Sequence, residues 1–356
     1  MIALIMAGGV GTRFWPKSRE KHPKQLLKIL GENTMIQCTV KRLLPLIPLD
    51  KIFVVTTEKQ REEIIAQLPH LPAENFIIEP KGKNTAPCIG LGALFLERID
   101  PDEVMVVMPA DHLISGDEQF IKTLKVGDKI AREKDNLITI GIEPTYPATG
   151  YGYIQYHEQI DTINGVTLLK VKTFAEKPNL ATAQRFMESG DFLWNSGIFI
   201  WKIKTILQEL EEYLPHLYDG LLEIRKVLGT DKQDETIHRV YCQIKSNSID
   251  YGVMEQAKDV VVLQGKFDWN DLGSWDEVYT ILSQNGEDNI LLGEHVILDG
   301  KGCYIDAPKR SVAVLGLDEL IVVDTDDAIL ICPRNRAQDV KDLVDLIKRK
   351  KMHKLL

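Results

Sequence analysis

The sequence predicts an α/β fold built on a doubly wound sheet. Apolar, β-branched runs such as 52–57 and 104–108 are continuous, which is typical of strands buried on both faces of a parallel sheet. Segments with helical spacing of apolar residues alternate with these runs, as βαβ units require. From about residue 285 the chain changes to short apolar runs separated by Gly, Asp and Asn. Together these observations predict a doubly wound, Rossmann-like mixed sheet followed by a small β domain, such as a short β-helix.

The bulk composition fits a folded protein and excludes several classes. The 356 residues are enough for one large domain and a small one, and 44% apolar with 27% charged residues is ordinary. A net charge of −9 argues against a nucleic-acid partner. The first residues lack the basic region of a signal peptide, and no apolar run approaches the ~20 residues of a membrane helix. The five dispersed cysteines form no C-x-x-C motif, so we expect reduced thiols, a cytoplasmic location and no membrane partner.

The N-terminus carries the strongest local signal. An apolar strand predicted over 2–6 turns directly into three closely spaced glycines, Gly8, Gly9 and Gly11. Glycines let backbone N–H groups approach a ligand closely, and successive amide dipoles create an anion-binding concavity. Arg13 and Lys24 follow, with Pro16 and Pro23 preventing one long helix. The pattern indicates a polyphosphate-binding loop.

Two other nucleotide-binding motifs do not fit this loop. Phe14 stands where a G-x-G-x-x-G dinucleotide motif needs its last glycine, and no Walker A motif is present. A glycine-rich surface turn with scattered charges is the alternative that the residues alone leave open.

The segment G8-G9-V10-G11-T12-R13-F14-W15-P16-K17-S18-R19 with P23-K24-Q25 resembles the signature of the nucleoside-diphosphate-sugar pyrophosphorylases. Its W-P-x-S-R and P-K-Q variants resemble the mannose-1-phosphate guanylyltransferases in particular, and later motifs follow in the same order. The resemblance implies a nucleotide-diphospho-sugar transferase (GT-A-like) fold. It also implies GMP transfer from GTP to α-D-mannose 1-phosphate, giving GDP-mannose and pyrophosphate. Arg13 and Lys24 would bind phosphates beside a loop made of Ala7, Gly8, Gly9, Gly11 and Thr12.

The segment 79–87 joins a predicted strand to a predicted helix. By itself it favours a simple helix cap at Asn84 or Thr85. It resembles the family element E-P-x-x-x-N-T-A-P, which implies nucleotide contacts from Asn84, Thr85 and Pro87.

Asp111 follows the clearest central strand, 104–108, where a carboxylate can hold Mg²⁺ or simply close a turn. The resemblance implies a metal-binding and catalytic role for Asp111. It pairs Asp111 with Asp271, which precedes L-G-S-W, as the two Mg²⁺ ligands. Asp268 is expected to be a turn residue or a partner of the metal ligands.

Three motifs resemble sugar-phosphate elements of the family. The Tyr- and Gly-rich segment 144–154 could be a plain hairpin entry, but its Y-G-Y-I motif implies sugar contacts from Tyr151 and Gly152. Adjacent Glu and Lys residues are usually a solvated pair, yet the F-x-E-K-P motif implies that Glu176 binds the sugar and Lys177 its phosphate. The W-N-S-G motif implies that Asn195 contacts sugar hydroxyls. Residues 202–258 are expected to be scaffold; the segment 251–255 resembles a family segment that begins a helix near the sugar, but no site is predicted there.

We therefore predict a catalytic domain over 1–284 and a small β domain over 285–356, which ends in a basic amphipathic helix over 336–351. The resemblance suggests a homodimer, and the phosphomannose-isomerase half of bifunctional relatives is expected to be absent. Two alternatives stay open: the same chemistry with another nucleotide or sugar 1-phosphate, and a non-catalytic sugar-nucleotide sensor.

Overall fold

The computed structural model describes residues 1–283 and 288–356 and divides the chain into two compact units. Unit 1 comprises Met1–Gly8 and Cys38–Trp269; unit 2 comprises Gly9–Gln37 and Asn270–Leu356. The domain boundary predicted between 284 and 285 lies outside the described residues and stays a prediction.

Unit 1 is built on a nine-stranded mixed sheet with the order β3-β2-β1-β4-β9-β6-β10-β8-β7. Its strands are β1 (Ile2–Met6), β2 (Ile52–Thr57), β3 (Phe76–Glu79), β4 (Val104–Pro109), β6 (Leu137–Ile142), β7 (Gly152–Ile163), β8 (Val166–Glu176), β9 (Phe192–Lys202) and β10 (Val260–Gly265). β1, β2, β3 and β4 run parallel to one another, whereas β9 is antiparallel to both β4 and β6. The predicted doubly wound mixed sheet is confirmed.

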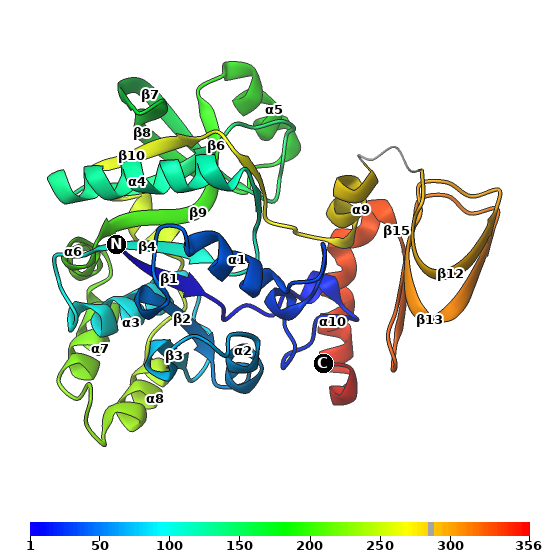
Figure 1. Ribbon diagram of the computed structural model, residues 1–356, viewed down its shortest axis with the longest axis horizontal. Coiled ribbons are helices and arrows are strands. Elements are labelled where there is room, and N and C mark those ends of the chain that lie inside the picture. Colours follow the sequence, from blue (N-terminus) through cyan, green and yellow to red (C-terminus); the bar gives the residue numbers. More distant parts are fainter. Residues whose placement is uncertain (284–287) are drawn as a thin grey trace. The chain divides into compact units, whose positions relative to one another are not determined.

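Helices cover both faces of this sheet (Figure 1). They are α2 (Arg61–Gln67), α3 (Thr85–Glu97), α4 (Asp117–Glu133), α5 (Leu180–Ser189), α6 (Ile203–Tyr213), α7 (Pro215–Arg225) and α8 (Gln233–Gln243); α1 (Met35–Leu43) begins in unit 2 and ends in unit 1. Successive strand residues face opposite sides. Phe199 and Trp201 of β9 therefore join the core with α3 and α6, while Ile200 meets Gly127 of α4.

The antiparallel strands bring the predicted sugar-binding motifs together. In the β7–β8 pair Gly152 is the partner of Glu176, and in the β7–β9 pair Tyr153 is the partner of Trp194. The register thus gathers three motifs that lie far apart in the sequence. Short strands β5 (Leu113–Ser115) and β11 (Asp268–Asn270) form a separate pair at the point where the chain leaves unit 1.

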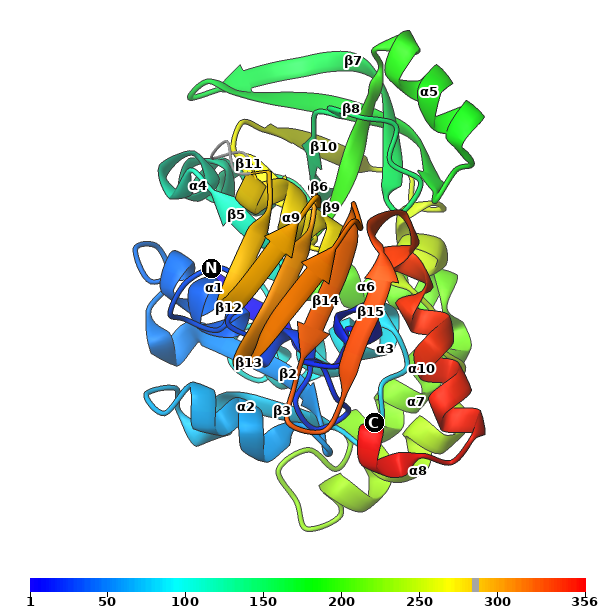
Figure 2. The same cartoon turned by 90° about the vertical axis from the view of Figure 1, so that its right-hand side faces the viewer.

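Unit 2 contains a four-stranded sheet (Figure 2). Its strands are β12 (Ile290–Leu298), β13 (Tyr304–Leu315), β14 (Leu320–Asp324) and β15 (Ile329–Pro333). β12, β13 and β14 run parallel to one another, and the corners between them are too short for a helical crossover. A parallel sheet with such corners is a coil of a β-helix, as predicted. Its small core contains Cys303, Ile305, Ala307, Val314 and Val322.

Unit 2 also contains α9 (Trp275–Ser283), a short 3₁₀ helix η6 (Arg334–Asp339) and α10 (Val340–Arg349). The helix predicted over 336–351 is therefore shorter and starts later. α10 buries Val340, Val344 and Ile347, as its spacing predicts, but Leu343 is 37% exposed. Among the described residues, no helix has both the length and the apolar character needed to cross a membrane.

Candidate functional site

The glycine loop belongs to unit 2 from Gly9 onward and is held by the segment that starts at Lys24. The main-chain N–H of Lys24 donates to the carbonyl oxygen of Val10 at 3.1 Å, and Gln25 Nε2 donates to that of Gly9 at 3.0 Å. Gly11 has φ +68°, and a Cβ atom there would lie 2.3 Å from Lys24 Cβ. Only glycine allows this approach.

Lys24 and Arg13 are the two predicted phosphate-binding cations, and both are withdrawn from solvent. Lys24 is only 4% exposed, while Arg13 lies half-buried in the 3₁₀ helix η1 (Thr12–Phe14). Arg13 Nε is buried without a hydrogen-bond partner among the described residues. Buried donors are almost always paired, so this nitrogen is available to an anionic ligand.

An acidic cluster lies beside Lys24 in unit 2. Lys24 Nζ donates to the main-chain oxygen of Asp271 at 2.6 Å. In the part of the chain that the structure describes, Asp271 Oδ1 is buried without a hydrogen-bond partner. Glu277, in the first turn of α9, accepts from the N–H of Gly273 at 2.7 Å. Burial, and then the Asp271 carboxylate, raise the pKa of Glu277 to about 7.

Glu277 was not predicted from the sequence. Its only local signal is its place in the first turn of the helix that begins at the tryptophan of the L-G-S-W motif. The orphaned oxygen of Asp271 suits a cation, because Mg²⁺ prefers carboxylate oxygens.

Asp111 lies in unit 1, just beyond β4. The next residue, His112, accepts a hydrogen bond at its Nδ1 from Trp269 Nε1 at 3.1 Å. Gly197 of β9 has φ +68°, and a Cβ atom there would lie 3.7 Å from Pro109 and 3.9 Å from His112. Asp111 and Asp271 belong to different units, so their shared metal site stays a prediction.

An aromatic cluster in unit 1 surrounds Tyr151. Its ring centroid lies 5.0 Å from that of Trp194 and 5.1 Å from that of Trp269, and Tyr146 lies 5.0 Å from Trp194. Flat aromatic faces of this kind can pack against a sugar ring or a base. Trp269 was missed at the sequence level, although it stands two residues before Asp271.

Gly152, Glu176 and Asn195 are brought together by the sheet register. A Cβ atom on Gly152 would lie 2.6 Å from Glu176 Oε2 and 3.5 Å from Asn195 Cβ. Lys177 forms an ion pair with Glu176, and its N–H donates to the carbonyl oxygen of Tyr151 at 3.2 Å. Lys177 has φ +45°, a strained backbone for a non-glycine residue of the kind that clusters at functional sites.

The structure adds Asp250 to this group. Asn195 Nδ2 donates to Asp250 Oδ1 at 2.7 Å. Burial of its carboxyl, and then the nearby Glu176 carboxylate, raise the pKa of Asp250. Asp250 opens the π-helix η5 (Asp250–Met254), which was expected to be scaffold. It directly precedes the segment 251–255, which resembles a family segment near the sugar, but no site was predicted there.

The loop predicted to touch the nucleotide is engaged in structural contacts in unit 1. Asn84 Oδ1 caps α3 by accepting from the N–H of Thr85 at 2.9 Å. Thr85 Oγ1 accepts from the N–H of Ile249 at 2.8 Å, and the carbonyl oxygen of the buried Pro87 accepts from Tyr241 Oη at 3.2 Å. Nucleotide contacts from this loop remain a prediction.

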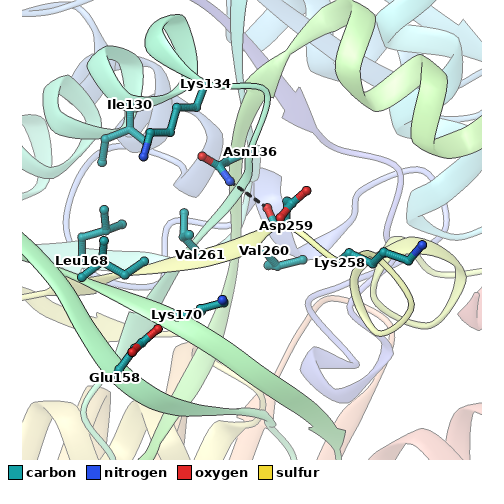
Figure 3. A pocket seen from close by; sticks show the side chains of 11 residues that line it. Ile130, Lys134, Asn136, Glu158, Leu168, Lys170, Lys258, Asp259, Val260 and Val261 are labelled. Carbon is teal, nitrogen blue, oxygen red and sulfur yellow. Dashed lines mark hydrogen bonds between the residues drawn. The ribbon is translucent and has the colours of Figure 1, made fainter.

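A surface pocket of about 380 Å³ lies elsewhere in unit 1 (Figure 3). It is lined by the beginning of β10, by β7 and β8, by the end of α4 and by the residues just before β6 and β10, including Lys134, Lys170 and Asp259. Ligands of open α/β sheets bind at the carboxyl ends of the strands, whereas this pocket lies at the opposite ends. It contains none of the predicted site residues.

Comparison with known proteins agrees with these features. Residues 2–287 match the family model "Nucleotidyl transferase", and residues 293–347 match "MannoseP isomerase/GMP-like beta-helix domain". The chain is 37% identical over 354 residues to a mannose-1-phosphate guanylyltransferase of Escherichia coli, covering 98% of this chain and 74% of that protein. It is 38% identical to the xanthan biosynthesis protein XanB of Xanthomonas campestris, covering 98% and 73%.

A solved structure from Thermus thermophilus, described as a mannose-1-phosphate geranyltransferase, has a TM-score of 0.86 and 32% identity to this chain. The match covers 98% of this chain and 99% of the other, so it includes both units. With the glycine loop, the sugar motifs and the β-helix in one chain, these matches lead to one assignment. The chain belongs to the nucleotidyl transferase family and, within it, to the mannose-1-phosphate guanylyltransferases.

Proposed function

We propose that this protein transfers GMP from GTP to α-D-mannose 1-phosphate, giving GDP-mannose and pyrophosphate. The observation that carries the proposal is the glycine loop of unit 2, where a buried lysine and an unpaired arginine nitrogen stand beside the loop backbone. The names of the relatives support the choice of GTP and mannose 1-phosphate. A cytoplasmic location and a homodimer complete the proposal; all five cysteines are free thiols.

The proposed reaction is a direct in-line displacement. A phosphate oxygen of the sugar 1-phosphate attacks the α-phosphorus of GTP, a new P–O bond forms, and the bond to the bridging oxygen of the β-phosphate breaks. Pyrophosphate carries away the electron pair. The nucleophile is already anionic, so neither a general base nor a covalent enzyme intermediate is needed. Positioning and neutralisation of charge therefore dominate the catalysis.

Arg13 and Lys24 bind the phosphates of the nucleotide and stabilise the departing pyrophosphate. Their charges are most effective here because both side chains are largely removed from water. Main-chain N–H groups of the glycine loop also bind the phosphates. Lys24 keeps its position through its bond to the Asp271 carbonyl oxygen.

The sugar 1-phosphate is held by the motifs on β7, β8 and β9. Lys177 anchors the phosphate, while Glu176 and Asn195 orient the sugar hydroxyls. Tyr151 and the rings around it provide an apolar wall. Asn195 suits hydroxyl groups because its amide offers both donors and an acceptor.

Nucleotidyl transferases generally use a divalent metal ion, and we propose Mg²⁺ for this chain. Asp111 and Asp271 would hold it, which accounts for the orphaned buried oxygen of Asp271. When bound, the ion neutralises charge on the reacting phosphates.

The test is to identify the product. Purified full-length protein is incubated with GTP, mannose 1-phosphate and Mg²⁺, and the mixture is separated by ion-exchange chromatography and weighed by mass spectrometry. GDP-mannose should form in equal amount to pyrophosphate, and Lys24→Ala should form neither at a comparable rate. A mixture that contains only GTP and its hydrolysis products would contradict the proposal.

A further inference from the structure

Asn195 has a side-chain amide with three hydrogen-bond partners in unit 1. Its Oδ1 accepts from the N–H of Gly197 at 3.1 Å and from Thr139 Oγ1 at 3.3 Å, and its Nδ2 donates to Asp250 Oδ1 at 2.7 Å. A backbone donor on one side and a carboxylate on the other leave the amide only one orientation. Since an amide nitrogen carries two hydrogens, the second N–H remains for another acceptor.

Asp250 is itself tied to the loop predicted to touch the nucleotide. The preceding residue, Ile249, donates its N–H to Thr85 Oγ1 at 2.8 Å, and Asn247 exchanges main-chain bonds with Lys83 and Ala86 at 3.2 and 3.1 Å. The segment 247–250 therefore connects the start of α3 with Asn195 on β9. π-helical turns such as η5 often occur at functional sites.

We infer that Asp250 is a positioning residue of the sugar subsite: it holds the Asn195 amide in one orientation, so that a hydroxyl of the sugar 1-phosphate meets a fixed donor. The inference rests on the proposed function and adds a residue to which no role has been given. Asp250 acts through Asn195, so its loss weakens the binding of the sugar phosphate and leaves that of the nucleotide largely unaffected. Burial, and then the neighbouring Glu176 carboxylate, raise the pKa of Asp250.

The test is a double-mutant cycle read by KM. Asp250→Ala should raise the KM for mannose 1-phosphate by tenfold or more, while the KM for GTP changes by less than twofold. Asp250→Asn keeps an oxygen that can accept from Asn195 Nδ2, so its KM should stay within about threefold of wild type. In an Asn195→Ala background, the further change Asp250→Ala should raise KM by less than twofold. Tyr251→Ala, at the next position of η5 with 58% of its side-chain surface exposed, is the matched control and should behave as wild type.

Several results would overturn the inference. One is an unchanged KM for mannose 1-phosphate in Asp250→Ala; another is the full tenfold effect repeated in the Asn195→Ala background. Equal increases in both KM values would assign Asp250 to the scaffold instead. If the alanine variant does not fold, Asp250→Ser, whose hydroxyl is too short to reach Nδ2, takes its place in the cycle. If the wild-type protein is inactive with every nucleotide and sugar 1-phosphate, the proposed function itself is overturned.

Discussion

The ammonium of Lys24 donates a hydrogen bond to the main-chain oxygen of Asp271 at 2.6 Å, joining two positions that lie 247 residues apart in the sequence. This bond places the cation of the glycine loop beside the carboxylate expected to hold the metal. Both residues belong to unit 2, so the contact lies within one compact body. The lysine predicted to bind phosphate and the aspartate predicted to bind metal are thus linked through one backbone oxygen.

Arg13→Ala should lower kcat by about 10²-fold or more, because a preorganised donor to the phosphates is lost. The fold should persist, since Arg13 Nε has no hydrogen-bond partner among the described residues. Steady-state pyrophosphate release measures the effect, and circular dichroism checks the fold. Arg61→Ala, an exposed residue of α2, removes the same charge and should leave kcat unchanged. Wild-type turnover in Arg13→Ala would remove Arg13 from the mechanism.

Asp271→Asn should lower activity by about 10²-fold, comparable to the loss of other charge-stabilising groups, and should weaken the response to added Mg²⁺. The substitution keeps the size of the side chain and leaves the main-chain oxygen to Lys24, so the loop should stay in place. Titrating Mg²⁺ against initial rate gives the measurement. Asp268→Asn, at an exposed position three residues earlier, is the control. Identical Mg²⁺ curves for wild type and Asp271→Asn would make Asp271 structural.

Gly11→Ala should destabilise unit 2 by about 1–3 kcal/mol, because the added carbon would meet Lys24 Cβ at 2.3 Å in a backbone with φ +68°. Gly9→Ala is a close control, since a Cβ atom at Gly9 meets nothing within 4 Å. Its unfolding free energy should stay within about 0.5 kcal/mol of wild type. Chemical denaturation of both variants measures the difference. Equal stability of the two would refute the close approach.

Glu79→Gln should change how stability depends on pH. Burial raises the pKa of Glu79 from 4.5 to about 7, while Tyr241 Oη donates to its Oε1 at 3.0 Å. Between these two pH values the folded state keeps a proton that the unfolded state has lost, so the free energy of unfolding falls as pH rises. Relative to Glu79→Gln, wild type should lose up to about 3 kcal/mol across this window.

Denaturant titrations at pH 5, 6, 7 and 8 test this dependence. Glu74→Gln, an exposed residue before β3, should keep the wild-type profile. Parallel profiles for wild type and Glu79→Gln would mean that Glu79 ionises normally in the folded protein.

Much of the fold follows from local patterns. Continuous apolar runs identified β2 and β4. A strand that is covered on both faces has apolar side chains on both, so its sequence does not alternate between apolar and polar residues. The short apolar runs after residue 288 identified the coil of unit 2. The helix at the C-terminus was placed too early, since η6 takes up its predicted first turn.

The site was predicted only where a motif carried it. Gly152, Glu176 and Asn195 were each expected, and the sheet register brings them together. Asp250 was missed because its contact with Asn195 spans 55 residues and depends on how a helical segment packs against β9. The grouping of Gly9–Gln37 with Asn270–Leu356 has the same origin. No local pattern encodes such contacts.

The most direct test of the central claim is the choice of nucleotide. Pyrophosphate release is measured with purified protein, Mg²⁺ and mannose 1-phosphate, with GTP, ATP, UTP and dTTP compared at equal concentration. Release with GTP at least tenfold faster than with the other three is the expected result. Faster release with another nucleotide would keep the displacement mechanism and contradict GDP-mannose synthesis. No release with any nucleotide, for mannose 1-phosphate or glucose 1-phosphate, would contradict the account as a whole.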